Sequence, residues 1–268
     1  MPAVADSGAW PIDTHILQRR DVDRSYQLWV ALPMGYRPDA SDPYPLVVCC
    51  DAPWTFGTAV DTTRILSMSR ETPRCVVAGI AHDTADMREM LDLRAVDYTV
   101  TPAEAPPMTG IRVPAAETGQ AEPFRQWLAS DVMPLLYDRY HVGEPTYVGH
   151  SFTALFGLHV LFNAPDMFAR YLLASPSVWW DREEQGDGVM FRLEAEHAEE
   201  GGDPAVKVFM SMGEHETDEY SPQAKFWDQF SARGYRNIDA TWHVFPGENH
   251  NTVVGSAVSR GLRTLYAD

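Results

Sequence analysis

The sequence predicts an α/β fold with a mostly parallel central sheet flanked by helices. Short apolar runs typical of strands alternate with longer helical patterns over most of the chain, as in a parallel sheet covered on both faces. Several of these runs are continuously apolar, as strands buried on both faces are. The 268 residues are 45% hydrophobic, which is enough for one large core. We therefore expect a single domain over residues 1–268.

The expected strands differ in their burial. Residues 26–32 alternate polar and apolar side chains, which is typical of an edge or half-exposed strand. Residues 45–51 are apolar up to Asp51 and predict a central strand buried on both faces. The other expected strands cover residues 74–80, 146–149, 171–174, 205–210 and 238–245.

Three helices are predicted by apolar side chains that recur at spacings of three and four residues. The first covers residues 124–140, the second residues 221–233 and the third residues 252–266. Gly234 follows the second helix at a position where glycine commonly ends a helix.

Two stretches interrupt this alternation. Residues 101–123 contain five prolines and no periodicity, which favours a lid or binding loop, with an inert surface excursion as the alternative. Residues 181–203 carry an acidic run that is typical of a solvated helix face, and this segment is also a candidate for a smaller cap insertion.

The composition excludes several classes of partner. A formal net charge of −17 repels the phosphates of nucleic acids and anionic membrane surfaces. Residues 1–12 lack the features of a secretory signal, and no apolar run is long enough to span a bilayer, so we expect a cytoplasmic protein. Cys49, Cys50 and Cys75 are too few for a disulfide framework and are expected to be reduced core residues.

The sharpest local feature is the segment Gly149-His150-Ser151-Phe152-Thr153, in which an expected strand runs directly into a helical pattern. A serine at such a corner sits on a tight turn with its hydroxyl exposed, as in the nucleophile elbow of the α/β-hydrolases. The usual pattern is G-x-S-x-G, and Thr153 replaces its last glycine. The alternative is a serine that only caps a helix.

The order of residues along the chain favours the elbow. An α/β-hydrolase needs a serine, then an acid, then a histidine, each at the end of its own strand. Glu214 and Glu216 follow the strand expected at residues 205–210, and His250 follows the strand expected at residues 238–245.

These segments resemble the putative-esterase family of α/β-hydrolases, and most closely its siderophore-esterase-like branch. The family includes esterase D-type enzymes, siderophore trilactone esterases, feruloyl esterases and mycolyl transferases. The patterns S-P-S-x-W-W and G-E-N-H are the most specific. The resemblance covers most of the chain from about Arg20 and is carried by residues 44–51, 94–102, 124–140, 149–151, 174–181, 213–216 and 245–250.

The resemblance implies a serine carboxylic-ester hydrolase in which Ser151 is the nucleophile and His250 the general base. Glu216 is the expected acid because it stands three residues after a glycine at a strand end, and Glu214 and Asp218 are the alternatives. His150 precedes the nucleophile and is expected to be a packing residue that points away from it.

An oxyanion hole is expected to combine the backbone N–H of Phe152 with a second N–H from the loop after Asp51. Pro53 has no N–H, so the second donor is either Ala52 or Trp54.

Arg94 is a candidate for orienting a carboxylate or phenolate of the substrate, or else for pairing with Asp97. Aromatic side chains near the catalytic face are candidates for stacking on an aromatic or macrocyclic ester, with ordinary core packing as the alternative. They are Trp54, Phe56, Phe152, Trp179 and Trp180.

The expected partner is a small-molecule ester, with no cofactor, nucleic acid or membrane, and the sequence leaves the oligomeric state open. Acyl transfer by the same residues and a repurposed binding protein are the alternative functions. We expect no metal site. His215 lies between Glu214 and Glu216, but the side chains of three consecutive residues do not converge on one ion.

Overall fold

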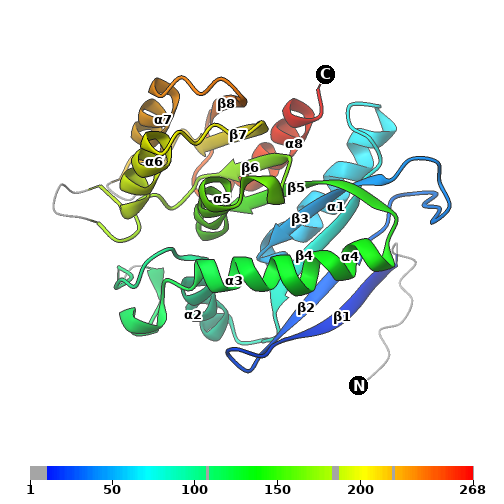
Figure 1. Cartoon of the computed structure of the whole chain (residues 1–268), viewed down its shortest axis with the longest axis horizontal. Coiled ribbons are helices and arrows are strands. Elements are labelled where there is room, and N and C mark those ends of the chain that lie inside the picture. The colour runs from blue at the N-terminus through cyan, green and yellow to red at the C-terminus, as the bar shows by residue number, and fades with distance from the viewer. Residues whose placement is uncertain (1–10, 107–108, 183–186, 219–220, 268) are drawn as a thin grey trace.

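The computed structural model describes residues 11–106, 109–182, 187–218 and 221–267. Within these ranges eight strands form one sheet in the order β1-β2-β4-β3-β5-β6-β7-β8 (Figure 1). Strands β1 and β2 are antiparallel to their neighbours, and the other strands run parallel. The strands are β1 (Ile12–Arg19), β2 (Arg24–Ala31), β3 (Tyr44–Cys50), β4 (Val76–His82), β5 (Val142–His150), β6 (Arg170–Ala174), β7 (Val206–Gly213) and β8 (Ile238–Phe245).

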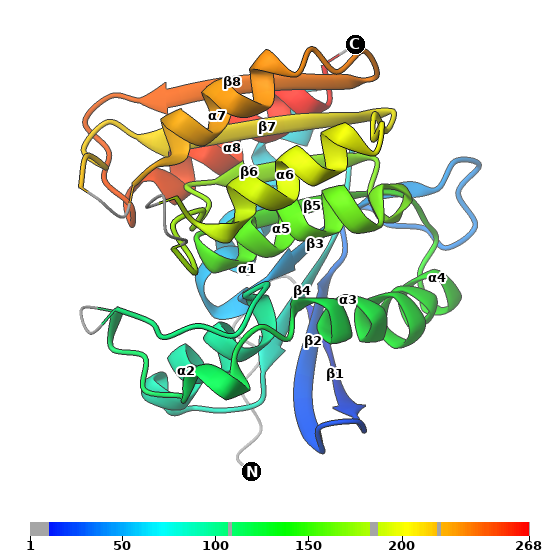
Figure 2. The same cartoon turned by 60° about the vertical axis from the view of Figure 1, so that its left-hand side comes forward.

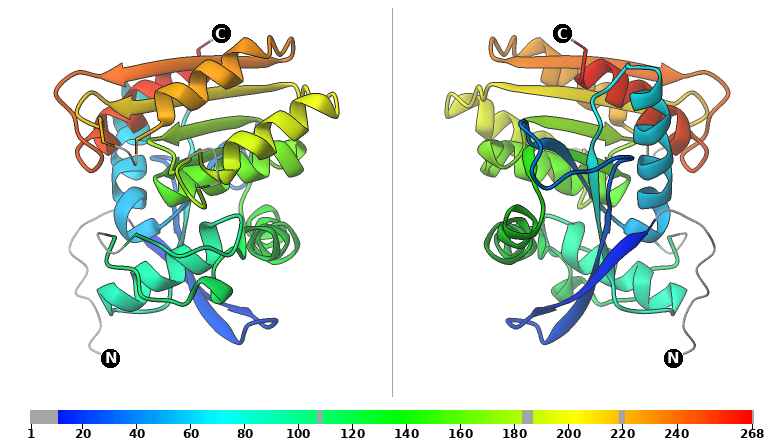
Figure 3. Two further views of the ribbon diagram at one scale, coloured as in Figure 1. Left: turned by 90° about the vertical axis from the view of Figure 1, so that its left-hand side faces the viewer. Right: turned by 90° about the vertical axis from the view of Figure 1, so that its right-hand side faces the viewer.

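Helices cover both faces of the sheet, as the sequence predicts. Helices α1 and α8 pack on one face, and the remaining α-helices pack on the other, as the two views of Figure 3 show. Figure 2 shows α5, α6 and α7 in front of the sheet and α8 behind it. The helices are α1 (Ala52–Met68), α2 (Met87–Tyr98), α3 (Ala121–Trp127), α4 (Met133–Arg139), α5 (Phe152–Asn163), α6 (Val189–Glu199), α7 (Gln223–Ala232) and α8 (Val253–Leu265).

The strand at the N-terminal edge of the sheet is not among the predicted ones. Among the described strands β1 pairs only with β2, and its Ile12 and Ile16 side chains are exposed, so its sequence shows no continuous apolar face. Of the two alternatives for residues 26–32, an edge strand or a half-exposed one, the structure shows the half-exposed strand, in which buried and half-buried side chains alternate. These residues form β2, which lies between β1 and β4.

The helix predicted over residues 124–140 begins three residues earlier and contains an irregular turn. Helix α3, the π-helical turn η3 (Leu128–Val132) and α4 form one continuous rod (Figure 1). Pro134 has no N–H to donate to the carbonyl of Ser130, so one helical hydrogen bond is missing there. The wider π-helical turn lies just before this missing bond.

Two helices that position the site, α1 and α2, follow strand ends. The sequences of both helices show only weak amphipathic patterns. Helix α1 begins directly after Asp51, whose backbone is left-handed and whose side chain does not cap the helix. Helix α2 begins after Asp86, whose carboxylate accepts from the backbone N–H groups of Arg88 and Glu89.

The two interrupting stretches have different places in the fold. Thr109 and Ile111 of the proline-rich stretch line a cavity of about 1090 Å³ that Ser151 and His250 also line, so this loop reaches the candidate site. The segment 181–203 contains α6, which packs against α5 and α7 in the helix layer. None of its described residues lines that cavity.

The acidic run of α6 is not uniformly solvated. Glu194 is fully buried, because its carboxylate accepts hydrogen bonds from Gln229, Arg233 and Tyr235. The three cysteines are free and buried, as expected. Burial raises the pKa of the Cys49 and Cys75 thiols to about 12, which leaves them inert. Within the described ranges, no helix is long and apolar enough to cross a membrane.

Candidate active site

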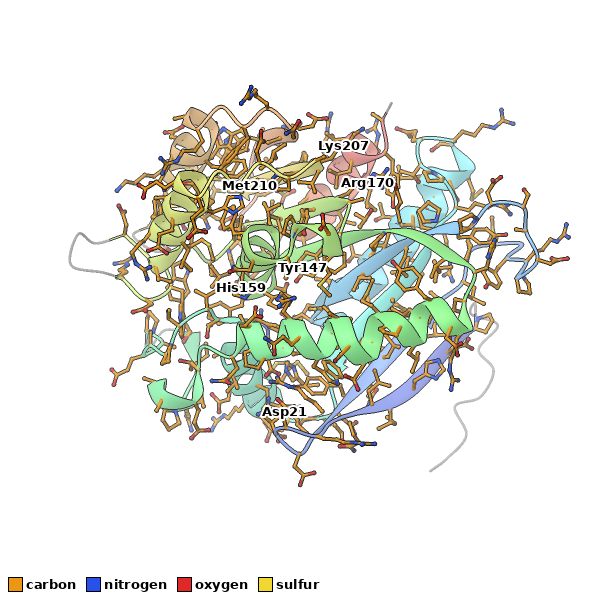
Figure 4. All side chains as sticks on the ribbon, in the orientation of Figure 1. Asp21, Tyr147, His159, Arg170, Lys207 and Met210 are labelled. Carbon is orange, nitrogen blue, oxygen red and sulfur yellow. The ribbon has the colours of Figure 1, made fainter. Side chains whose placement is uncertain are left out.

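The turn between β5 and α5 places Ser151 in a strained conformation. Its φ of 59° and ψ of −118° are unusual for a residue with a side chain and lift its hydroxyl off the end of the sheet. Gly149 is required two residues earlier, because a Cβ atom there would lie 2.5 Å from the carbonyl oxygen of Thr153. The Tyr147 hydroxyl, near the centre of Figure 4, donates to that same carbonyl at 2.7 Å.

Thr153 stabilises the turn with its side chain, although the usual pattern has glycine there. Its hydroxyl oxygen accepts from the N–H of His150 at 2.8 Å and donates to the carbonyl of His150 at 2.9 Å. The side chain is fully buried, so the departure from G-x-S-x-G is accommodated inside the turn.

Three side chains from different strand ends form one hydrogen-bonded chain. The Oγ atom of Ser151 lies 3.0 Å from Nε2 of His250, and Nδ1 of His250 lies 2.8 Å from the carboxylate of Glu216. A carboxylate only accepts, so Nδ1 of His250 carries the ring proton and Nε2 is free to accept the proton of Ser151. This arrangement is the one that nucleophilic catalysis by serine requires.

The Glu216 carboxylate is held in its ionised form. Burial by itself would raise its pKa, but hydrogen bonds from His250, Ser175 and the backbone N–H of Gly213 outweigh burial, and the pKa is lowered. Of the three predicted acids, Glu216 is the one that contacts the histidine. Glu214 is exposed and accepts from the N–H of Gly247, and Asp218 accepts from Ser221 at the rim of the cavity.

His150 does more than pack. Its Nε2 atom lies 2.7 Å from the backbone carbonyl of His250, and the two rings are 4.7 Å apart. Because a carbonyl only accepts, Nε2 of His150 carries the proton. Burial chiefly, and the nearby His250 in second place, lower the pKa of His150 to about 3, so the ring is neutral at physiological pH.

Two serines after β6 also contact these residues, and the sequence shows them only as part of the S-P-S-x-W-W pattern. Ser175 is fully buried and donates to Glu216 at 2.5 Å. The Oγ atom of Ser177 lies 3.1 Å from that of Ser151.

Of the two predicted partners of Phe152 in an oxyanion hole, the structure favours Ala52. Ala52 and Phe152 are the first residues of α1 and α5, which follow the neighbouring parallel strands β3 and β5. The N–H of Trp54 is already bonded to the carbonyl of Asp51 at 2.9 Å, so Trp54 as the donor is wrong. No described residue accepts from the N–H of Ala52 or Phe152, and helix N-termini favour negative charge.

A cavity of about 1090 Å³ opens beside Ser151 and His250. Trp54, Phe152 and Trp179 line it. The other two aromatic candidates do not reach it. Phe56 is buried against Trp29 and beneath Gly79, and Trp180 is fully buried and donates to the carbonyl of Thr101. Substrate contact by Phe56 and Trp180 is therefore wrong, because both side chains point into the core.

Arg94 lies in the cavity wall but does not pair with Asp97. Its Nε donates to the buried carboxylate of Asp51 at 2.6 Å, and its guanidinium lies 5.6 Å from the centre of the Phe152 ring. Among the described residues, none accepts a hydrogen bond from its two outer nitrogens. Asp97 is instead buried among side chains of the N-terminal strands. The described residues contain no group of three or more His, Cys, Asp or Glu suited to a metal ion.

The fold and this site define a serine hydrolase of the α/β-hydrolase class. The family model described as putative esterase matches residues 20–260, and the chain belongs to that family. Its activity class is therefore the hydrolysis of carboxylic esters by a serine enzyme.

Several relatives are named for siderophores. The chain is 26% identical over 271 residues to the ferri-bacillibactin esterase BesA of Bacillus subtilis, covering 96% of this chain and 90% of that one. It is 22% identical to a siderophore triacetylfusarinine C esterase of Aspergillus fumigatus, covering 92% and 91% of the two chains. It is 33% identical to a siderophore enterobactin esterase of Emericella nidulans, over only 59% of this chain and 55% of that one.

Solved structures share the fold. The siderophore hydrolase EstA of Aspergillus nidulans superposes with a TM-score of 0.82 at 22% identity, over 99% of this chain and 97% of that chain. The BES protein of Bacillus cereus superposes with a TM-score of 0.80 at 20% identity, over 96% of each chain.

Proposed function

We propose that this protein hydrolyses an ester of the siderophore type through an acyl-enzyme, with Ser151 as nucleophile, His250 as general base and Glu216 as acid. The observation that carries the proposal is the continuous hydrogen-bonded chain from the Ser151 hydroxyl through His250 to the buried Glu216 carboxylate.

Each step follows from the positions of these groups. The Oγ atom of Ser151 attacks the ester carbonyl while its proton passes to Nε2 of His250. The N–H groups of Phe152 and Ala52 hold the oxyanion that forms. His250 then gives the proton to the departing alkoxide, and a water molecule, activated by the same imidazole, releases the acid. Glu216 stabilises the imidazolium that forms twice in each cycle.

The kind of ester is inferred from the cavity and the relatives. A cavity of about 1090 Å³ is large enough for a macrocyclic or branched ester, and Trp54 and Trp179 offer aromatic surfaces in its wall. The outer nitrogens of Arg94 are available to one phenolate or carboxylate of such a molecule. Relatives named as siderophore esterases support this substrate class. A cytoplasmic location belongs to the same proposal.

A fluorophosphonate probe tests the nucleophile. The unmodified protein is expected to be labelled, and Ser151→Ala is expected to lose labelling and ester turnover. Ser130→Ala, at an exposed position on the long helix, is the matched control and is expected to behave as the unmodified protein. Full labelling and turnover by Ser151→Ala would contradict the proposal.

Product analysis separates hydrolysis from the two alternatives. Incubation of a trilactone siderophore with the protein is expected to give linear acids whether or not an added alcohol or amine is present. New esters or amides in the presence of the acceptor would point to acyl transfer. Binding of the trilactone without any product would point to a binding protein.

A further inference from the structure

A second serine hydroxyl lies against the proposed nucleophile. Ser177 is 1% exposed, and its Oγ atom is 3.1 Å from Oγ of Ser151. Ser177 follows β6, the strand between β5, which leads to Ser151, and β7, which leads to Glu216. The contact is direct, so the Ser177 hydroxyl touches the atom that reacts.

The direction of this hydrogen bond follows from counting protons. Nδ1 of His250 is protonated because it faces the Glu216 carboxylate, so Nε2 can only accept. The single proton of the Ser151 hydroxyl is therefore donated to His250 at 3.0 Å. The contact at 3.1 Å is left for the Ser177 hydroxyl to donate and the Ser151 oxygen to accept.

We propose that Ser177 is a further catalytic residue, which donates a hydrogen bond to the Ser151 oxygen and stabilises the negative charge that develops on it. This inference rests on the proposed function. The charge develops when the Ser151 proton passes to His250 during attack, and again when the same oxygen departs as the acyl-enzyme is hydrolysed. Ser177 keeps its own proton throughout, so the proton balance of the reaction is unchanged.

The backbone holds Ser177 in place independently of its hydroxyl. Its N–H donates to the carbonyl of Ser151 at 3.2 Å, and its carbonyl accepts from the N–H of Trp180 at 3.1 Å. Pro176 fixes the backbone before it. Two residues earlier, the Ser175 hydroxyl donates to Glu216, so one tripeptide contacts both the acid and the nucleophile. A Ser177→Ala variant therefore removes the hydroxyl and leaves these backbone contacts.

The test is the reactivity of the nucleophile in Ser177→Ala. We expect kcat/KM for a p-nitrophenyl ester and the rate constant of inactivation by a fluorophosphonate to fall together by about tenfold to a hundredfold, the size of effect that one hydrogen bond to a charged group has. The KM, the melting temperature and the shape of the pH profile are expected to stay unchanged. Ser177→Thr keeps a hydroxyl and is expected to restore most of the rate.

Ser211→Ala is the matched control. The backbone carbonyl of Ser211 accepts from the N–H of Ser175. The buried hydroxyl of Ser211 has no hydrogen-bond partner among the described residues. Its loss is expected to leave the inactivation rate unchanged, which isolates the contact with Ser151 from the mere removal of a buried hydroxyl.

Each other outcome overturns the inference in a recognisable way. Full reactivity of Ser177→Ala, while Ser151→Ala is inactive, removes Ser177 from the reaction and leaves the proposed function intact. A fall that comes with a lower melting temperature and is not restored by Ser177→Thr assigns Ser177 a structural role. Undiminished turnover by Ser151→Ala defeats the proposed function itself.

Discussion

Glu216 is the residue whose role the geometry separates most clearly from that of its neighbours. It reaches His250 at 2.8 Å from a buried position, while Glu214, two residues before it, is exposed and bonded to a backbone N–H. Both residues follow the end of β7 at Gly213, where the chain turns and the N–H of Glu216 donates to the carbonyl of Gly213 at 3.2 Å, so the two side chains leave this turn in different directions.

Replacement of Glu216 by Gln is therefore expected to lower kcat by about a hundredfold or more, because the amide no longer stabilises the imidazolium and disfavours the required tautomer of His250. Steady-state kinetics of purified Glu216→Gln measures the loss. Glu214→Gln is the control, with kcat expected to stay close to that of the unmodified protein. A larger loss in Glu214→Gln would exchange the two roles.

At the residue scale, the sequence predicted the members of the hydrogen-bonded chain because their order and their positions after strand ends are imposed by the fold. It did not predict side-chain direction. Trp179 lines the cavity and Trp180 is buried in the core, although they are adjacent and of the same type. Arg94 bonds to Asp51, 43 positions before it in the chain, a contact that only the folded chain creates.

At the scale of elements, the order of strands and helices was predictable wherever a strong apolar pattern existed. Strand β1 carries no buried face, and helix α1 presents only a weak pattern after a strained Asp51, so the sequence indicated neither. A local pattern of apolar residues reveals an element only when one of its faces is buried. These two elements instead form because they pair and pack with distant segments of the chain.

The N-terminal strands are joined to α2 by one buried carboxylate. Asp97 is fully buried, and two arginines, a tyrosine and a histidine contact it. Burial would raise its pKa, but these contacts outweigh burial and lower it below the ordinary value. The contacts are from Arg19 at 3.0 Å, Arg24 at 3.0 Å, Tyr26 at 2.6 Å and His82 at 2.9 Å.

Asp97→Asn is expected to lower the free energy of unfolding by about 3–5 kcal/mol, because it removes a buried counter-ion from the half-buried Arg24 and from the buried Arg19, which keeps only Asp21 among the described residues. Urea unfolding near neutral pH measures this loss. Asp61→Asn, at an exposed position of α1, is the control and is expected to leave the unfolding curve unchanged. An unchanged midpoint for Asp97→Asn would show that the carboxylate charge is dispensable.

The contribution of the Asp97 carboxylate to the free energy of unfolding decreases in acid. The pKa of Asp97 is lower in the folded state than in the unfolded chain, so the stabilisation is complete above the unfolded value of about 4 and is lost as the pH falls through the folded value. Acid unfolding of the unmodified protein is expected to include this loss. The stability difference between it and Asp97→Asn should shrink as the solution becomes more acidic.

At the scale of the whole molecule, negative charge extends from the surface into the site. The formal net charge is −17, and Arg94 is the one arginine among the described residues that line the cavity, which also include Asp51, Glu216 and Asp218. The residues outside the described ranges contain no lysine or arginine. A polyanionic ester therefore meets repulsion that a single guanidinium does not offset.

We expect kcat/KM for an uncharged ester to exceed that for a trianionic ester of matched size and leaving group by about tenfold at low ionic strength, and salt to narrow the difference by screening. Parallel kinetics at low and high salt measure both effects. Asp218→Asn is expected to favour the anionic ester selectively. If the protein instead preferred the trianionic ester and salt weakened that preference, the electrostatic potential at the site would be positive, which contradicts the inference.

The position of β6 between β5 and β7 sets the reach that catalysis has to cover. Nucleophile and acid are anchored two strand spacings apart, about 9.5 Å at the level of the sheet. The side chains of Ser151 and Glu216 cover part of this gap, and the imidazole of His250 joins them with one hydrogen bond from each ring nitrogen, at 3.0 and 2.8 Å. Strand β6 therefore sets the separation of nucleophile and acid, and the two serines that follow it, Ser175 and Ser177, contact Glu216 and Ser151 respectively.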